Sequence, residues 1–375
     1  MSKNRLPGVR FFGKPTGLSG YSQATRYIAK AFASSCVPVS FQGKHEYYKG
    51  MSTCDDTCQV DFYIQTPPFS RHKSRNYKIG YFYWEADRLP NDWGRDICSS
   101  LDEVWVPCEL TKRACRKAGF RGPIEVLFTP RPKEALSSEV AIPLRGSSNL
   151  TIGGGTYVFY SIFQWNERKG YRKLIRAFYE EFSGQDNVIL VIKTNPVKHK
   201  DHGITKIKTD MLSMKKFSRG RDSSPIFMIT ESLSDEHISG LHFYGDCFVL
   251  PHHGEGWGMP IHDAMLHNSL VITTPYGGIT EHLNDSNALL IKHKLTSVRP
   301  MNWNPYYRAD QKWADPDLGH LRALMREAYG NQDAHGDMVG RAKRVAESMS
   351  IAAFSTQVEG ILSQKRFLKI AGGTV

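Results

Sequence analysis

The chain has 375 residues, of which 40% are hydrophobic and 11% aromatic. At about 150 residues per domain, this length predicts two domains, each with a core of its own. Peptide hormones, disulfide-stapled mini-proteins and intrinsically disordered chains are excluded. Lys and Arg outnumber Asp and Glu by 49 to 37, which gives a formal charge of +12. This excess favours an acidic partner, such as a nucleotide, a nucleic acid or an anionic lipid surface.

The first residues lack the apolar core of a signal peptide, and no run of about 18 apolar residues occurs. We therefore expect a soluble cytoplasmic protein that associates at most peripherally with a membrane or with DNA. The seven cysteines are an odd set without a CxxC pair, which indicates reduced thiols rather than a zinc site. No metal-binding residues are predicted.

Predicted strands and helices alternate along the first 130 residues, which is typical of α/β architecture with parallel sheets. Strands are expected at 9–12, 60–65, 78–84, 103–107 and 124–128, and helices at 22–34 and 111–119. The loop GKPTGLSGYS follows the first strand and holds Gly17 and Gly20. Glycine loops at helix N-termini suit anionic ligands, so both glycines are predicted to line a ligand cleft.

An interdomain linker is predicted at 129–150, where three prolines and two Ser-Ser pairs occur without any hydrophobic period. This places an N-terminal domain at 1–145 and a C-terminal domain at 146–345. The remaining residues, 346–375, are expected to form a C-terminal helix that packs back on the N-terminal domain.

The alternating pattern restarts after the linker. Strands are expected at 156–163, 187–193, 226–230, 246–251, 270–274 and 288–291, and helices at 166–182, 234–239, from 260 onward, 317–329 and 338–362. Two α/β units would leave a cleft between them, and open parallel sheets bind ligands at the carboxyl ends of their strands. That cleft is the predicted ligand site.

The most informative motif is FVLPHHGEGWGMPIHDAM, in which a predicted buried strand runs into a glycine-punctuated loop and then a helix. Glu255 in the loop and Asp263 on the helix are eight residues apart, so both carboxylates can face one ligand. The loop amides of Gly256, Trp257 and Gly258 lie at the start of that helix, where unpaired N–H groups favour a phosphate.

A second glycine turn follows the next predicted strand. Gly277 and Gly278 form it and precede Glu281, so they would add backbone donors beside the first loop. Basic residues come from two other strand ends. Arg168 and Lys169 follow the strand at 156–163, and Lys193 ends the strand at 187–193. Cations at these places suit a diphosphate.

These segments together resemble the C-terminal nucleotide-sugar domain of family-4, glycogen-synthase-like retaining glycosyltransferases of the GT-B fold. The hallmark of that family is a Glu, seven residues and a second Glu, and here the second acid is Asp. The resemblance implies that Glu255 contacts the transferred sugar and that Asp263 binds the ribose hydroxyls. It also implies that Arg168 and Lys169 neutralise the diphosphate, although the usual Arg-x4-Lys spacing is absent.

Other segments extend the resemblance over nearly the whole chain. They are GLSGYS, GYFYWEADRLPNDW, TPYGGITEHL and WADPDLGHLRALMREAY. The resemblance implies an α/β fold with two Rossmann-like domains facing a central cleft, followed by C-terminal helices. The N-terminal domain would take the acceptor, and the C-terminal domain would take the nucleotide sugar.

The implied activity is a retaining, metal-independent transfer of a hexose from a nucleotide diphosphate sugar, with a UDP-sugar favoured, to an acceptor hydroxyl. No cofactor is expected beyond that co-substrate. A glycan or a lipid-linked saccharide is the first choice of acceptor. A hydroxylated base of DNA is the alternative, because residues 1–130 hold 19 Lys and Arg against 12 Asp and Glu. Dense basic runs occur at RHKSRNYK and KRACRK.

Two other functions remain open at this point. One is a sugar-nucleotide epimerase or a phosphorylase of the same fold. The other is a nucleic-acid-binding module without catalysis, which only the basic charge supports. Product analysis would separate the enzymes, and salt-dependent DNA binding unaffected by a nucleotide sugar would identify the module. The oligomeric state is not predicted.

Overall fold

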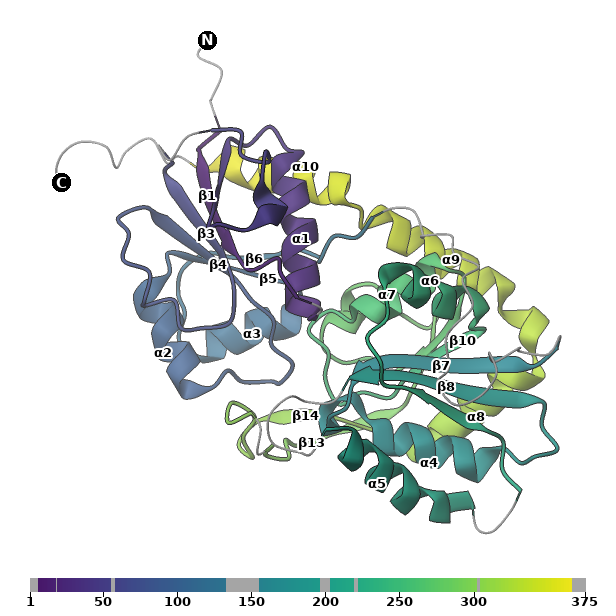
Figure 1. Ribbon diagram of the computed structural model, residues 1–375. Coiled ribbons are helices and arrows are strands. Elements are labelled where there is room, and N and C mark those ends of the chain that lie inside the picture. The colour runs from purple at the N-terminus through teal and green to yellow at the C-terminus, as the bar shows by residue number, and fades with distance from the viewer. Residues whose placement is uncertain are drawn as a thin grey trace. The chain divides into compact units, whose positions relative to one another are not determined.

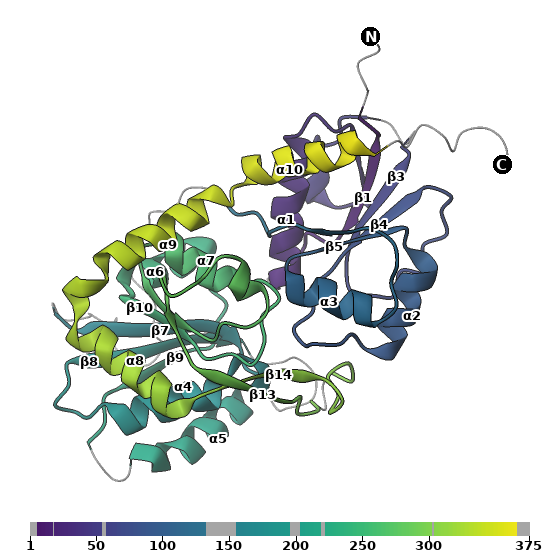
Figure 2. The ribbon, with the colours of Figure 1, turned by 180° about the vertical axis from the view of Figure 1, so that it is seen from behind.

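The computed structural model describes residues 6–17, 19–54, 58–132, 155–195, 203–218, 222–301 and 304–365. The chain divides into two compact units, which are described separately (Figures 1 and 2). The first unit comprises residues 1–133 and 348–375, and the second comprises residues 134–347. Most of the predicted linker at 129–150 lies outside the described residues.

The first unit is built on a parallel sheet with the strand order β2-β1-β3-β4-β5-β6. Its strands are β1 (Val9–Gly13), β2 (Val39–Gln42), β3 (Val60–Ile64), β4 (Tyr77–Tyr81), β5 (Glu103–Val106) and β6 (Ile124–Val126). The chain goes from β1 to β2 on one side and then crosses to β3 on the other side of β1. The strand order therefore reverses between β1 and β3, which is where such sheets bind ligands. Among these strands the sequence analysis missed only the short β2, and it also missed a helix at 91–100.

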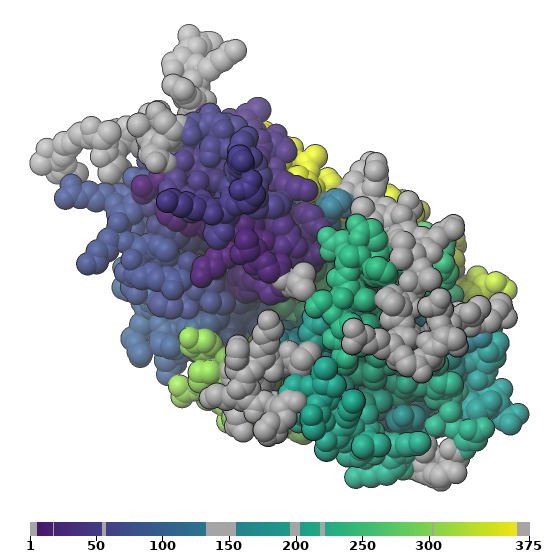
Figure 3. Space-filling view, in the orientation of Figure 1, coloured from purple at the N-terminus to yellow at the C-terminus, as the bar shows by residue number. Residues whose placement is uncertain are grey.

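Helices α1 (Gly20–Ala33), α2 (Asn91–Ser100) and α3 (Glu109–Lys117) connect these strands. The last helix of the chain, α10 (Ile351–Gln364), packs against α1, as the yellow segment beside the purple one shows in Figures 1 and 3. Ser355 on α10 donates a hydrogen bond of 2.8 Å to the carbonyl of Ala31. The C-terminal helix thus belongs to the N-terminal unit.

The second unit holds a parallel sheet with the order β12-β11-β10-β7-β8-β9. Its strands are β7 (Tyr157–Gln164), β8 (Val188–Asn195), β9 (Ile226–Ile229), β10 (Cys247–Leu250), β11 (Leu270–Thr273) and β12 (Leu289–Leu290). Their runs of Val, Ile, Leu and Phe are buried on both faces, as expected for a parallel sheet that helices cover. The strand order reverses between β7 and β10.

The helices of this unit are α4 (Tyr171–Glu181), α5 (Ile204–Met214), α6 (Asp235–Tyr244), α7 (Met259–Leu266), α8 (Leu318–Gly330) and α9 (Gly336–Ser348). An antiparallel pair, β13 (His293–Ser297) and β14 (Lys312–Pro316), lies outside the main sheet and was not predicted. No helix of the described residues is long and apolar enough to cross a membrane.

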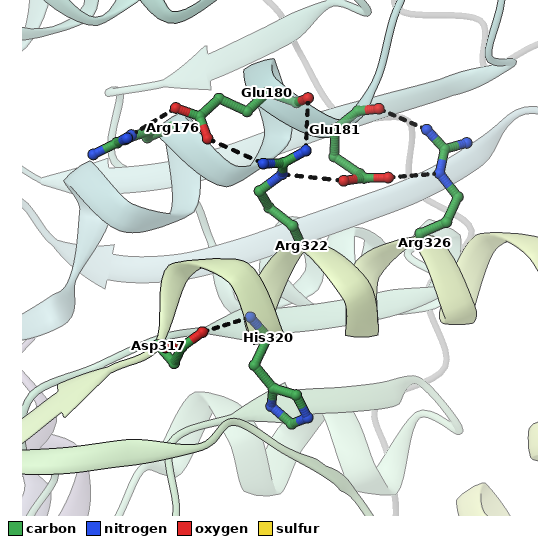
Figure 4. Close-up of polar contacts among 7 residues, drawn as sticks. All are labelled: Arg176, Glu180, Glu181, Asp317, His320, Arg322 and Arg326. Carbon is green, nitrogen blue, oxygen red and sulfur yellow. Dashed lines mark hydrogen bonds and ion pairs between the residues drawn. The ribbon is translucent and has the colours of Figure 1, made fainter.

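Ion pairs fix α4 against α8 (Figure 4). Nε of Arg326 lies 2.9 Å from one Glu181 oxygen, and Nε of Arg322 lies 3.1 Å from the other. Arg322 also reaches Glu180, at 3.4 Å. These carboxylates are mostly buried, so the charged contacts stabilise them better than an exposed pair would be stabilised. Helix α4 follows directly after Arg168 and Lys169, so its fixed position also holds those two cations.

Two predicted helices are each interrupted. The helix predicted at 166–182 is a 3-10 turn, η2 (Glu167–Lys169), followed by α4, because Gly170 takes a left-handed φ of 70° between them. The helix predicted at 338–362 is divided into α9 and α10. At the break the amide of Arg131 donates to Met349 O at 3.2 Å, and Ile351 donates to Arg131 O at 3.1 Å. These bonds replace helical ones.

The break requires a new helix start, and Ser350 provides it. Its hydroxyl accepts a hydrogen bond from the amide of Ala353 at 3.2 Å. Replacing an N-cap serine with alanine leaves that amide unpaired, so Ser350→Ala should lower the free energy of unfolding by about 1 kcal/mol. Urea denaturation measures this. The exposed Ser363→Ala in the same helix is the control and should not destabilise the protein. Equal stability of the two variants would contradict the capping assignment.

Candidate functional site

Three loops meet at the carboxyl edge of the sheet in the second unit, where its strand order reverses. Residues 165–170 follow β7, residues 251–258 follow β10, and residues 274–281 follow β11. Backbone contacts join them, because the amide of His253 donates to Arg168 O at 2.7 Å and that of Gly278 donates to Glu255 O at 2.8 Å. Open α/β sheets bind ligands at this kind of position.

The centre of the site is the carboxylate of Glu255, which lies between Arg168 and Lys169. Nη1 of Arg168 lies 3.0 Å from Oε1 of Glu255, and the Lys169 ammonium contacts the same oxygen. Arg168 also donates to Gly254 O at 2.6 Å. The three charged side chains are only 13%, 11% and 7% exposed, in the order Arg168, Lys169 and Glu255. Two cations and one anion leave this buried cluster with a net positive charge.

These charges decide the protonation state of the acid. Burial acts to raise the pKa of the Glu255 carboxyl, but the positive charges of Lys169 and Arg168 outweigh it and lower the pKa to about 2. Glu255 is therefore ionised at neutral pH. A carboxylate in this state accepts hydrogen bonds and cannot donate a proton.

Three glycines allow the loops to approach so closely. A Cβ atom on Gly170 would lie 1.8 Å from Pro251 O, and one on Gly277 would lie 2.1 Å from Glu255 O. A Cβ atom on Gly278 would meet the carbonyl of Gly256, also at 2.1 Å. Side chains cannot be accommodated at such distances. The sequence analysis placed Gly277 and Gly278 at the site as backbone donors, but the amide of Gly278 already donates to Glu255 O and so joins the two loops instead. The lack of a side chain at both glycines lets these loops come together.

The loop Gly256–Gly258 leads directly into α7. Gly258, with a φ of 83°, is the residue before the first turn of this helix, and Trp257 beside it is buried. The Trp257 ring packs on the ring of His282, with centroids 4.6 Å apart. The amides of this loop therefore lie next to the start of a helix, as the sequence predicted.

The remaining predicted residues of this unit come from three further elements. Asp263 is half-buried on α7, and Glu281 is half-buried at the end of the 3-10 turn η4 (Gly278–Glu281). Lys193, near the end of β8, is buried and donates to Thr194 O at 3.2 Å and to Oδ1 of Asn195 at 2.8 Å. Burial lowers the pKa of the Lys193 ammonium. The described residues contain no cluster of His, Cys, Asp or Glu suited to a metal ion.

Four further polar side chains at this edge were missed as site residues. They are buried, and each holds a side-chain atom that finds no hydrogen-bond partner among the described residues: Oδ1 of Asn166, Oγ1 of Thr194, both ring nitrogens of His252 and Oγ1 of Thr274. Each residue follows or ends a strand, β7, β8, β10 or β11 in turn. Buried polar atoms without partners are costly, so their gathering here marks a site for a polar ligand.

His252 is the largest of these side chains that is fully buried. Its side chain is fully buried beside Glu255, and burial lowers the pKa of His252 to about 3. The imidazole is therefore neutral at physiological pH and offers one donor and one acceptor. Its position directly after a buried strand was the available sequence signal, because strand ends meet at the ligand edge.

Gly17 and Gly20 belong to the first unit. Gly17 takes a φ of 110° in the loop after β1, and Gly20 is the first residue of α1. Ser19 caps this helix by accepting from the amide of Ser22 at 3.1 Å. Gly17 thus lies in the loop after β1 and Gly20 at the start of the helix that follows it, at the point where the strand order of their own sheet reverses.

No model of a protein family matches the sequence, and none of the curated proteins resembles it in sequence. Solved structures do share its fold. HepE of Anabaena, in complex with UDP and glucose, is 11% identical with a TM-score of 0.68, over 96% of this chain and 100% of that one. Sucrose-phosphate synthase of Thermosynechococcus elongatus is 10% identical with a TM-score of 0.68, over 96% and 98%. Trehalose-6-phosphate synthase OtsA is 10% identical with a TM-score of 0.68, and the match covers 96% of this chain and 99% of that one.

These matches cover nearly all of this chain and nearly all of each other chain. Together with the two six-stranded parallel sheets, they confirm the fold class predicted from the sequence, which is α/β of the GT-B type with two Rossmann-like units. At identities of 10% and 11%, these matches show that the fold is shared.

The close approach of the glycine turn to the Glu255 loop can be tested by adding a methyl group. Gly277→Ala places a Cβ against a carbonyl at a φ of 83°, so we expect a loss of about 2 kcal/mol or more in the free energy of unfolding. The control is Gly360→Ala, on an exposed part of α10 with open space around the Cβ, which should stabilise the protein by about 0.5–1 kcal/mol. Urea denaturation of both variants tests this, and a Gly277→Ala protein of wild-type stability would contradict the contact.

Proposed function

We propose that this protein is a glycosyltransferase that takes a hexose from a nucleotide diphosphate sugar bound at the carboxyl edge of the second unit. One observation carries the proposal. Arg168, Lys169 and Glu255 form a buried, net positive cluster where the strand order reverses, and unpartnered polar groups surround it. A buried net positive charge favours an anionic ligand, and a diphosphate supplies one.

The structures with the same fold support this choice of ligand. HepE was solved with UDP and glucose and also with UDP-glucose. A trehalose-6-phosphate structure from E. coli contains UDP-2-fluoro glucose, at a TM-score of 0.67 and 10% identity. We therefore favour a UDP-sugar as the donor of this chain.

The chemistry follows from the group that leaves. Cleavage of a sugar–phosphate bond builds positive charge on the sugar and negative charge on the departing diphosphate. Arg168 and Lys169, held by α4, are placed to stabilise that negative charge, and the amides of Gly256 and Gly277 add donors. Preorganised charges of this kind lower the barrier without reorganisation. We propose that they do so without a metal ion.

Glu255 has a different role in this proposal. Its carboxylate is ionised, so it cannot act as a proton donor, and its contacts with two cations make it a poor nucleophile. It is suited to accept a hydrogen bond from a hydroxyl of the transferred sugar. The reaction then retains configuration by front-face attack, in which the acceptor hydroxyl gives its proton to the leaving phosphate oxygen. No protein nucleophile is needed.

Asp263 and Lys193 complete the donor site in this account. Asp263 would accept hydrogen bonds from the ribose hydroxyls, and Glu281 would extend the acidic side of the same pocket. Lys193 would face the phosphate or the sugar from β8. The acceptor is proposed to be a hydroxyl of a glycan or a lipid-linked saccharide, with a hydroxylated DNA base as the alternative. The basic balance of residues 1–130 favours the second, anionic acceptor.

Glu255→Gln tests this division of roles. The substitution keeps the size and removes the charge, while both cations stay in place. We expect UDP to stabilise the variant against thermal unfolding at least as strongly as it stabilises the wild type, because more positive charge faces the diphosphate. Release of UDP from UDP-glucose or another UDP-sugar should fall by about 100-fold or more, because a buried hydrogen-bond acceptor for the sugar is lost.

The matched control is Glu327→Gln, an exposed glutamate on α8, which should leave both readouts unchanged. Product analysis identifies the reaction, since an epimerase would convert the sugar without transferring it. Undiminished sugar transfer in Glu255→Gln, or the absence of any stabilisation by UDP- and GDP-sugars, would disprove the proposal.

A further inference from the structure

A second polar site lies in the first unit, away from the residues considered so far. An open pocket of about 570 Å³ is lined by residues from the loop before β4, from β4 and from the end of α2. The lining residues are Ser70, His72, Lys73, Ser74, Arg75, Lys78, Ser99 and Ser100. Four of these are hydroxyl residues and three are permanent cations. The pocket therefore combines polar side chains with positive charge.

The cations of this pocket are not neutralised within the described part of the chain. No ion pair involves Lys73, Arg75 or Lys78, although the neighbouring Arg10 is paired with Asp61 at 2.7 Å. Lys73 and Arg75 are exposed. The positive charge of the pocket therefore remains available to an external anion.

The nearest carboxylates on the same elements serve the backbone. Asp96 on α2 accepts from the amides of Phe69 and Ser70, at 2.6 and 3.0 Å. Asp102 accepts from the amide of Lys78 at 2.8 Å. These bonds hold the loop before β4 against α2 and the start of β5. They fix the position of the loop that carries Lys73 and Arg75.

The pocket lies at the opposite edge of the sheet from the loop after β1. Lys78 is the second residue of β4, and Ser99 and Ser100 end α2 two residues before β5 begins, so the pocket is at the amino ends of these parallel strands. The glycine loop with Gly17 is at the carboxyl end of β1. The pocket is thus separate from the edge at which this sheet would present an acceptor hydroxyl.

The lining also limits the kind of anion. Proteins that bind single-stranded nucleic acid use exposed aromatic rings on which bases stack. The one aromatic group here, His72, is already stacked on Tyr63, with ring centroids 4.3 Å apart and planes 29° apart. Serine hydroxyls and unpaired Lys and Arg side chains are instead the groups that contact the phosphates of a duplex.

We propose that this pocket binds the phosphate backbone of double-stranded DNA, through Lys73, Arg75 and Lys78, without reading its sequence. Arg95 lies one helical turn before Ser99 on the exposed side of α2 and extends the positive surface. Binding of the duplex is independent of the donor site. That the duplex also carries the acceptor hydroxyl rests on the proposed function.

The test compares the wild type with the triple variant Lys73→Gln, Arg75→Gln, Lys78→Gln. Fluorescence anisotropy of a labelled DNA duplex of about 20 base pairs gives the dissociation constant at several salt concentrations. The slope of log K against log salt is negative, and each lost phosphate contact makes it less steep by about 0.9. The three lost contacts together should therefore reduce its steepness by about 2.7. Between about 50 and 200 mM salt, the wild-type affinity should fall about 40-fold more than that of the variant.

The control variant is Lys44→Gln, Arg344→Gln, Lys208→Gln, which removes the same number of exposed cations that have no ion pair within the described part of the chain. It should keep the wild-type slope. Thermal stabilisation of the triple variant by UDP shows that this variant is folded. The same measurement on the wild type tests the donor site separately from DNA binding. The proposal is overturned if the wild type does not bind the duplex at about 50 mM salt, or if the triple variant keeps the wild-type slope. It is also overturned if inorganic phosphate displaces the duplex at equal ionic strength, or if anionic lipid vesicles alone are bound through these residues.

Discussion

The ion cluster of Glu255 with Arg168 and Lys169 determines how the second unit is assembled around its sheet. A carboxylate that is 7% exposed requires charged partners, since an unpaired buried charge costs several kcal/mol. The partners come from the turn after β7, and the acid comes from the loop after β10, so the pairing joins two strand ends that are far apart in sequence. The α4–α8 ion pairs hold the cations from one side. The glycine turn at 277–278 holds the acid from the other.

The same arrangement explains why the site is suited to a polar, anionic ligand. Two cations against one anion leave a net positive charge, and the neighbouring Asn166, His252 and Thr274 hold buried polar atoms that have no partner among the described residues. A protein core stabilised only for its own sake would pair or remove such groups. Their persistence at one sheet edge is best explained by a polar, anionic ligand. A nucleotide diphosphate sugar has both properties.

The sequence predicted the parts of this account that depend on local patterning. Buried parallel strands appear as short apolar runs, and the glycine, proline and acidic residues between β10 and α7 have a specific spacing. Strand β2 and the pair β13–β14 were missed because they are short or exposed and lack a continuous apolar run. The break at Ser350 was missed because α9 and α10 continue one helical pattern, and only the contact with Arg131 interrupts it. The unpartnered atoms of His252 and Thr194 depend on three-dimensional burial, which no motif encodes.

A crystal structure of the protein with UDP tests the central claim most directly. The account predicts that the β-phosphate lies within hydrogen-bond distance of Arg168 and Lys169, at the carboxyl edge between β7 and β10, and that Asp263 accepts hydrogen bonds from the ribose. It also predicts that one or more of the unpartnered atoms of Asn166, Thr194, His252 and Thr274 gain a partner. A nucleotide bound elsewhere, or one whose phosphates do not contact Arg168 or Lys169, would contradict it.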